Sequence, residues 1–337
     1  MVRLKDIAER GGVSVMTVSK VMRDAPDISA ATKARIRRLA DEMGYVPDSA
    51  AQSLRTRTTR LFGLIIPAIT NPVFGRMTLA IEDFSHEHGY DLFLAHTHNL
   101  PEREEACIRK LLSRRVDGLF ISPVYRLSPS APIYEELEKN GTPTVILGQR
   151  APFCSQFASV ESDDLPASSA ATRHLLELGH RRVAFLAGPG TSLWAQERLE
   201  GYRRALREAD LTVEDRLIFS AGATIEEGEK AALQLLQECT DVTAVQAAND
   251  LAAIGAANIL LSQGFKIPHD ISVVGFGNFL VSEYFRVPLT TIRQPKFRLG
   301  VAAMDAMQKL LKGEQPGTRR LAGQLVIRAS SGPPPVK

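Results

Sequence analysis

The sequence predicts a small all-α head joined to a larger two-lobed α/β core with parallel sheets. Three observations lead to this fold class. The first sixty residues show short helical patterns separated by glycine, proline and aspartate. From Leu61 onward, apolar strand patterns alternate with helical ones, as in parallel sheets covered by helices. These units fall into two runs, about 61–160 and 161–290, and 337 residues provide room for about two domains.

The head is basic and the rest of the chain is slightly acidic. Residues 1–60 contain 12 Lys and Arg against 7 Asp and Glu, which leaves 29 against 31 for the remainder. A basic head favours contact with a polyanion, although a solvated basic surface has the same composition. The charges in MVRLKDIAER oppose a signal peptide, and the apolar run Leu61–Ile69 is too short to cross a membrane. With three cysteines and no CxxC pair, this predicts a cytoplasmic protein that contacts no membrane.

Three helices are predicted in the head. An apolar spacing of i, i+3 and i+4 predicts a short helix over residues 4–10. Ser14 is expected to cap a second helix, roughly Val15–Met22, and Ser29 a third that ends before Gly44. This is helix-turn-helix spacing, in which the second helix enters a major groove, although a plain three-helix bundle has the same pattern.

A short basic segment follows the head. Pro47 ends the preceding element, Asp48 is placed to cap a new helix, and Ser49–Arg55 is too short to be a stable helix alone. Leu54 is an isolated apolar residue with arginines close behind it. This pattern fits a side chain wedged into a minor groove, or an ordinary linker with an incidental leucine.

The core is predicted from strand and helix patterns that alternate along the chain. The expected strands are Phe62–Ile66, Asp91–Ala95, Gly118–Ser122, Thr144–Leu147, Val183–Ala187, Leu217–Ser220, Ala244–Ala248 and Ser272–Phe276. The expected helices are Val73–His88, Glu102–Arg114, Ile133–Asn140, Leu165–Leu178, Trp194–Ala209, Ile225–Glu238 and Leu251–Gln263. Thr290–Lys312 and Gln324–Arg328 are expected to cross between the lobes, and ligands of such sheets bind at the carboxyl ends of the strands.

Two stretches of the chain carry a family resemblance. LKDIAERGGVSVMTVSKVMRD and GYVPDSAAQSLRTRTTRLFGLIIP closely resemble the LacI/GalR family of bacterial transcription regulators, and the resemblance extends over the whole chain. It implies a helix-turn-helix domain, a hinge helix, and a sensor core like the periplasmic sugar-binding proteins. The implied boundaries are 1–46 for the head, 47–60 for the hinge and linker, and 61–337 for the core, with lobe one at about 61–160 plus 293–322 and lobe two at about 161–290 plus 323–330.

The resemblance also implies a function. The chain is expected to be a repressor that binds palindromic double-stranded DNA as a homodimer and whose operator affinity changes when a small carbohydrate-like effector binds between the lobes. Family geometry places Lys20 and Val15 against base edges, and Arg23 against phosphate. The full set of expected DNA contacts is Val15, Met16, Thr17, Ser19, Lys20, Arg23, Ala51, Leu54 and Arg55.

The expected effector contacts lie at strand ends. The family pattern, together with strand-end positions, predicts Asn71, Phe74, Ser122, Gln149, Trp194, Arg198, Asn249, Gly277 and Gln294. Trp194 precedes Arg198 by four residues, so the two share a helix face. Core packing of Trp194 is an equally good interpretation. A buried Arg198 needs an acceptor, which is either a ligand or an acid.

One position departs from the family. After the strand that ends at Phe276, the family usually has Gly-Tyr-Asp and then Asp or Asn, whereas this chain has Gly277 at the usual effector-binding carboxylate. Because a buried, unpaired Arg198 would favour an anionic partner, we expect a sugar acid or similar anion rather than a neutral sugar. Glu283 or Asp250 could instead supply the acid, which restores the neutral sugar.

Other chemistries are disfavoured. AGPG at 187–190 lacks the third glycine of a dinucleotide loop, and His96 and His98 have no cysteine or acid that completes a metal set. Asp163-Asp164 lies at a helix start, where capping is the expected role. No nucleophile, base and oxyanion site assemble, so we expect no catalytic residues, no cofactor, no metal and no enzyme.

Assembly and two alternative functions remain open at this point. The end of the chain, LVIRASSGPPPVK, carries no leucine heptads, so a homodimer without a tail-driven tetramer is expected. A regulator of the same fold could answer mainly to a protein partner. A non-sensing architectural DNA binder would bind any duplex with uniform affinity.

Overall fold

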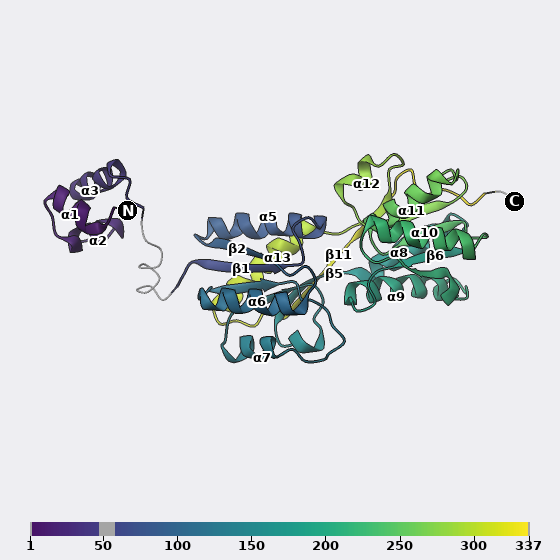
Figure 1. Cartoon of the computed structure of the whole chain (residues 1–337), viewed down its shortest axis with the longest axis horizontal. Coiled ribbons are helices and arrows are strands. Elements are labelled where there is room, and N and C mark those ends of the chain that lie inside the picture. The colour runs from purple at the N-terminus through teal and green to yellow at the C-terminus, as the bar shows by residue number, and fades with distance from the viewer. Residues whose placement is uncertain (1, 47–57, 336–337) are drawn as a thin grey trace. The chain divides into compact units, whose positions relative to one another are not determined.

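The structure is a computed structural model that describes residues 2–46 and 58–335. It divides into two compact units, Met1–Thr59 and Arg60–Lys337, and each is described by itself. The described part of the first unit folds into helices α1 (Leu4–Gly11), α2 (Val15–Met22) and α3 (Ala30–Glu42) (Figure 1).

The head forms its helices where the sequence predicts them. The Ser14 hydroxyl accepts a hydrogen bond from the Thr17 backbone N–H at 3.0 Å, and Ser29 caps α3 in the same way. Gly12 ends α1 with a φ of +62°, in the left-handed region that favours glycine. The side chains that pack between the three helices are Ile7, Ala8, Val18, Val21, Ile36 and Ala40.

The first lobe of the core is a parallel sheet in the order β11-β5-β4-β3-β1-β2. Its strands are β1 (Leu61–Ile66), β2 (Asp91–His96), β3 (Gly118–Ile121), β4 (Thr144–Leu147), β5 (Ala158–Asp163) and β11 (Thr318–Ala322). One face packs against α5 (Pro72–Glu87) and α13 (Lys296–Leu311), and the other against α6 (Pro101–Ser113) and α7 (Pro132–Lys139). Figure 1 shows α5 and α6 on opposite sides of β1.

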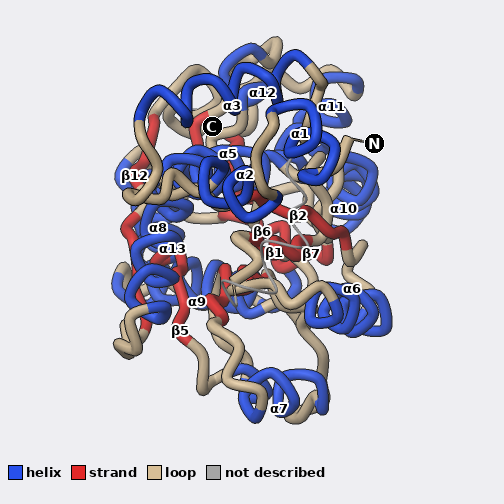
Figure 2. Tube along the Cα trace, turned by 90° about the vertical axis from the view of Figure 1, so that its left-hand side faces the viewer, coloured by secondary structure: helices blue, strands red, loops and turns tan. Residues whose placement is uncertain are grey.

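The second lobe repeats this plan in the order β12-β10-β9-β8-β6-β7, with β12 antiparallel to β10. Its strands are β6 (Val183–Ala187), β7 (Ile218–Ser220), β8 (Ala244–Ala247), β9 (Ser272–Gly277), β10 (Thr290–Arg293) and β12 (Gln324–Val326). One face carries α8 (Asp164–Glu177) and α9 (Leu193–Glu208), and the other α10 (Ile225–Glu238) and α11 (Asp250–Ser262). The short helix α12 (Leu280–Tyr284) follows β9. In Figure 2, β1, β2, β6 and β7 lie near the centre of the view, and β5 and β12 lie at its left edge.

The chain passes between the lobes after β5, after β10 and after β11. In each sheet the strand order reverses next to the first strand, and ligands of such sheets bind at this switch point, outside the carboxyl ends. The predicted two-lobed α/β fold with parallel sheets is therefore confirmed.

Four strands were not predicted as strands: β5, β10, β11 and β12. Thr290–Arg293 and Gln324–Val326 were expected to cross between lobes, but both are strands of the second sheet, and the crossings lie beside them. The β5 sequence is rich in hydroxyl and acidic residues, which hides the strand from an apolar pattern, and it pairs with β4 on one side and with the distant β11 on the other. The Ser159 hydroxyl, for example, donates to Thr318 Oγ1 of β11 at 3.0 Å.

Candidate functional site

The exposed face of α2 carries the residues predicted to read DNA. Val15 and Met16 begin the helix with 46% and 64% of their surface exposed, although both are apolar. Val18 and Val21 of the same helix are buried in the head. Because α2 buries one face and presents apolar groups on another, its first turn suits contact with a thymine methyl in a groove.

The polar residues of α2 have partners within the head. The Lys20 ammonium pairs with the Asp27 carboxylate. The Arg23 guanidinium donates to the Ser19 backbone oxygen at 2.9 Å, and the Thr17 hydroxyl lies 2.9 Å from that of Ser14. Lys20 must therefore exchange Asp27 for DNA when it docks. The predicted hinge residues Ala51, Leu54 and Arg55 lie outside the described residues.

A cavity of about 320 Å³ lies between the two lobes of the core, at the carboxyl ends of their strands. It brings together residues that are far apart in the sequence. The predicted residues that line it are Asn71, Phe74, Ser122, Gln149, Trp194, Arg198, Asn249 and Gln294. Lining residues that sequence reasoning missed include Asn99, Tyr125, Glu161, Ser162, Asp164 and Phe279.

Arg198 is buried at the floor of this pocket and already has an acid. Its Nε and Nη2 donate to Asp164 Oδ2 at 2.8 and 2.7 Å, and its Nη1 donates to the Ala248 backbone oxygen at 2.6 Å. The guanidinium carbon lies 3.7 Å from the centre of the Phe276 ring and 4.6 Å from that of Trp194. The shared face of Trp194 and Arg198 is thus present, and Trp194 packs against the core as well as lining the pocket.

Two expectations are corrected by this pair. Asp163-Asp164 does not cap α8 through a side chain, because Asp163 accepts from Arg320 and Asp164 pairs with Arg198. Arg198 is not a buried unpaired cation, so the argument for an anionic effector loses its premise. The acid comes from Asp164, and neither Glu283 nor Asp250 has this role.

Gly277 does not line the pocket. It has a φ of +137°, and a Cβ there would lie 2.6 Å from the Phe279 ring. That ring lines the cavity in its place, so the missing carboxylate leaves no free volume. The ammonium of Lys296 donates to the backbone oxygens of Gly277 and Asn278 behind this ring, and burial lowers the pKa of Lys296 to about 8.

Three polar side chains in or behind the pocket wall form hydrogen bonds that hold the local backbone. The Asn71 side chain accepts from the Val73 N–H at the start of α5. The Asn249 side chain caps α11 at Ala252 and donates to the Gly222 oxygen, so both ends of its amide are engaged. The buried carboxylate of Asp250 accepts from the Phe279 N–H and from the hydroxyls of Ser282 and Thr291. Asn249 and Asp250 therefore shape the pocket wall.

An ionic cluster spans the lobes at the pocket rim. Arg320 of β11 pairs with Glu197 of α9 through both carboxylate oxygens at 2.7 Å, and with Glu161 and Asp163 of β5 at 3.3 and 3.1 Å. Burial raises the pKa of Glu161, because desolvation penalises its charged form. The cluster joins one lobe to the other beside the ligand space.

Three polar atoms of the pocket residues have no partner. Ser162 Oγ, Asp164 Oδ1 and Gln294 Oε1 are buried and accept no hydrogen bond within the described residues. A buried acceptor without a donor is costly, so a water molecule or a ligand group that reaches these atoms and donates to them would stabilise the site.

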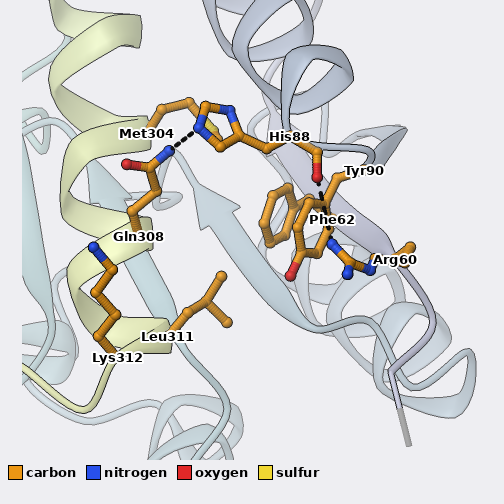
Figure 3. A pocket seen from close by; sticks show the side chains of 8 residues that line it. All are labelled: Arg60, Phe62, His88, Tyr90, Met304, Gln308, Leu311 and Lys312. Carbon is orange, nitrogen blue, oxygen red and sulfur yellow. Dashed lines mark hydrogen bonds between the residues drawn. The ribbon is translucent and has the colours of Figure 1, made fainter. Parts of the chain in front are cut away.

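Another hollow opens at the amino end of β1 (Figure 3). The Tyr90 and Phe62 rings stack there with centroids 4.1 Å apart, and the Arg60 guanidinium lies 5.1 Å from the Tyr90 centroid. The Gln308 amide donates to His88. None of the predicted effector residues lines it.

Within the described residues, no group of three His, Cys, Asp or Glu could bind a metal ion, and no helix is long and apolar enough to span a membrane.

Comparison with known families matches both parts of the chain. Residues 3–48 match the family described as bacterial regulatory proteins, lacI family. Residues 59–328 match the family described as periplasmic binding proteins and sugar binding domain of LacI family.

Individual relatives span the same length. The repressor PurR of Vibrio vulnificus is 32% identical over 330 residues, covering 97% of this chain and 98% of its own. The repressor CytR of Escherichia coli is also 32% identical, covering 97% and 96%. The lac repressor dimer bound to operator and the anti-inducer ONPF superposes with a TM-score of 0.86 at 28% identity, covering 98% and 99%. A complex of the regulator CelR with cellobiose has a TM-score of 0.75 at 29% identity, covering 98% and 100%.

Proposed function

The chain belongs to the LacI family of bacterial regulatory proteins, and from this premise we propose that it is a transcriptional repressor whose operator affinity is controlled by a small molecule bound between its lobes. The observation that carries the proposal is the pocket, which is lined by strand ends of both sheets. A ligand there contacts both lobes and therefore favours one relative angle of the lobes over another. A change in that angle is what couples the pocket to DNA binding.

The proposed DNA-binding unit is a homodimer on a palindromic site, with one α2 in each of two successive major grooves. Exposed apolar residues on two helices of the core support association of two chains. Leu79 of α5 is 46% exposed, and Leu280 and Tyr284 of α12 are 79% and 76% exposed. Both helices lie on the same side of the core (Figure 1). Such exposed apolar surface is typical of interaction sites.

We place the protein in the cytoplasm, where bacterial operator DNA lies, and assign it no catalytic activity. The pocket argues against an architectural DNA binder, because such a protein needs no ligand cavity between lobes.

The test is selection of bound sites from random duplex DNA by the full-length protein, with and without pooled metabolites. A palindromic consensus whose recovery changes with one pool supports the proposal. Uniform affinity for all duplexes contradicts it. A palindromic consensus that no pool alters, together with capture of a protein that does alter it, identifies a regulator controlled by a partner.

A further inference from the structure

We propose that Asp164 determines the ligand class of the pocket: by neutralising Arg198 it excludes anionic ligands, and the pocket takes an uncharged or cationic ring that donates hydrogen bonds. The inference rests on the proposed function, since it concerns the effector of the same site. It reverses the expectation of an anionic effector that was drawn from Gly277.

The first argument is that the charge of Arg198 is already neutralised by Asp164. Its Nε, Nη1 and Nη2 all donate within the protein, two of them to Asp164. Aromatic rings of Phe276 and Trp194 lie close to the guanidinium carbon, and only 6% of the residue is exposed. These three contacts use three of the five N–H groups of the guanidinium. A carboxylate or phosphate that bound the remaining N–H groups would share Arg198 with Asp164, and two anions would then lie in one buried site beside a single cation.

The second argument is the charge of the pocket and its rim. Within the described residues, the charged groups that line the cavity are the carboxyl groups of Glu161 and Asp164 and the guanidinium of Arg198. At the rim, Arg320 pairs with Glu161, Asp163 and Glu197, and the charge of Arg150 also acts on Glu161. Behind the Phe279 ring, Lys296 and Asp250 add one charge of each sign. Acids therefore outnumber bases among the described residues that line the cavity, which opposes an anion and favours a neutral or positive ligand.

The third argument is the hydrogen-bonding demand of the pocket. Asp164 Oδ1 and Gln294 Oε1 are acceptors only, and both are buried without a donor, as is Ser162 Oγ. A hydroxyl or amino group satisfies them, whereas an ionised carboxylate or phosphate group has no proton to donate. The two oxygens of Asp164 thus differ: Oδ2 pairs with Arg198, and Oδ1 is an acceptor without a hydrogen-bond donor.

The aromatic lining defines the shape of the ligand. Phe74, Trp194 and Phe279 all line the cavity. Flat faces beside hydrogen-bond acceptors suit a ring that carries hydroxyl or amino groups. Neutral sugars, amino sugars and nucleosides share this chemistry, while uronic acids and nucleotides add the charge that Asp164 opposes.

The decisive experiment uses inorganic phosphate as the probe and the full-length protein. Phosphate binding is measured by calorimetry and by thermal unfolding, against sodium chloride at equal ionic strength. We expect no saturable binding to the wild type. Asp164→Asn leaves Arg198 without its counter-charge and is expected to bind phosphate saturably, at least about tenfold more tightly than the weakest affinity that the measurement detects. The double variant Asp164→Asn/Arg198→Gln is expected to lose that binding.

The matched control is Asp215→Asn, which makes the same acid-to-amide change at an exposed position that does not line the cavity, and it is expected to behave as the wild type. Saturable phosphate binding to the wild type, or none to a folded Asp164→Asn protein, overturns the proposal. If Asp164→Asn does not unfold cooperatively, Asp164→Ser replaces it, because serine keeps an acceptor near Arg198 without the charge.

A second arm compares glucose, glucosamine and glucuronate, and adenosine with its 5′-monophosphate. Within each set we expect the wild type to bind the anion most weakly. In Asp164→Asn we expect a smaller difference between the affinity for the anion and the affinities for the other members. Tighter wild-type binding of an anionic member overturns the proposal. The operator selection tests the proposed function separately from this inference. If the protein selects no specific DNA but shows the expected phosphate results, the proposed regulatory function fails and the role of Asp164 stands.

Discussion

Lys20 of α2 and Arg23, which caps the end of that helix, lie three positions apart and have different surroundings. The Lys20 ammonium reaches across to Asp27, while Arg23 folds back onto the Ser19 oxygen of its own helix. A side chain that reaches away from its helix can contact base edges, whereas one that lies along the helix is nearer to the phosphates. The two substitutions therefore separate specificity from general affinity.

Lys20→Ala is expected to change base preference at one symmetric pair of operator positions, because the lost ammonium donates to guanine O6 and N7. The cost at those positions is about 1–3 kcal/mol. Selection of bound sites followed by competition with single-base variants measures it. An unchanged consensus would remove the assignment of Lys20 to a base edge.

Arg23→Ala serves as the contrasting variant. It is expected to weaken all sequences alike and to reduce the slope of log affinity against log salt by about 0.9, the value for one lost phosphate contact. A change in base preference in this variant would show that the two roles are exchanged.

His180 makes folding stability depend on pH. Its ring is fully buried, with Nδ1 at 2.8 Å from the Thr243 hydroxyl and Nε2 donating to the Gly332 oxygen at 2.8 Å. Burial lowers the pKa of His180 below its ordinary 6.5. The unfolded chain therefore binds more protons below about pH 6.5, so this contribution to stability is present above that pH and is lost as the pH falls below it.

The check is urea unfolding at about pH 7.5 and about pH 5.5 for the wild type and His180→Gln. The wild type is expected to lose more stability between the two values than the variant. His86→Gln, which changes an exposed histidine at the end of α5, is the control and is expected to follow the wild type. An equal loss in His180→Gln and the wild type would show that another group causes the dependence.

At the scale of the element, the segment that follows β12 contributes to lobe two through hydrogen bonds to a neighbouring strand. From the end of β12 to residue 335, where the described residues end, the chain carries no helix or strand. Ser330 and Gly332 are nevertheless bonded to β9, since Ser330 Oγ donates to the Val273 oxygen and the Gly332 N–H donates to Ser272 Oγ. Deletion of residues 331–337 would remove buried hydrogen bonds of lobe two. A truncation that tests assembly therefore starts after Pro333.

The hinge segment is the element whose role remains a prediction. Leu54 is expected to insert into a central base step of the operator, and unstacking that step costs a few kcal/mol that wrapped contacts repay. Leu54→Ala is expected to keep the dimer and the fold while losing DNA bending and most specific affinity. Circular permutation of the operator fragment measures the bend, and a wild-type bend with wild-type affinity would contradict the wedge.

At the scale of the whole molecule, the two lobes are joined by crossing segments and by the Arg320–Glu197 pair. These connections let a ligand in one pocket influence both lobes. Repression additionally needs two chains, since each palindromic half-site takes one α2.

The double variant Leu280→Lys/Tyr284→Lys is expected to be monomeric at concentrations where the wild type is dimeric, because it places charge on the exposed apolar face of α12. Operator affinity should fall at least about tenfold as the second half-site contact is lost. Light scattering and DNA titration measure the two effects. Leu127→Lys, at a 91% exposed position away from both helices, is the control. A dimeric double variant would place the interface elsewhere.

The sequence by itself determined the helices of the head and the alternating units of the core. Ser14 and Ser29 cap helices whatever surrounds them, and apolar periodicity depends on neighbours within a few positions. The family resemblance predicted most of the pocket residues, because positions that follow a given strand lie at the same edge of the sheet in proteins of the same fold.

Tertiary structure alone decided the pairing and charge of the pocket. Asp164 reads as a helix cap next to Asp163, and only the fold brings it to Arg198, 34 positions away. In the same way no strand was predicted at β5, whose hydroxyl and acidic side chains find partners in Thr318 and Arg320 of the distant β11. Ionic and hydrogen-bond partners distant in the sequence leave no local periodic signal, and for this reason the chemistry of the ligand site follows from the packed lobes rather than from the pattern of residues along the chain.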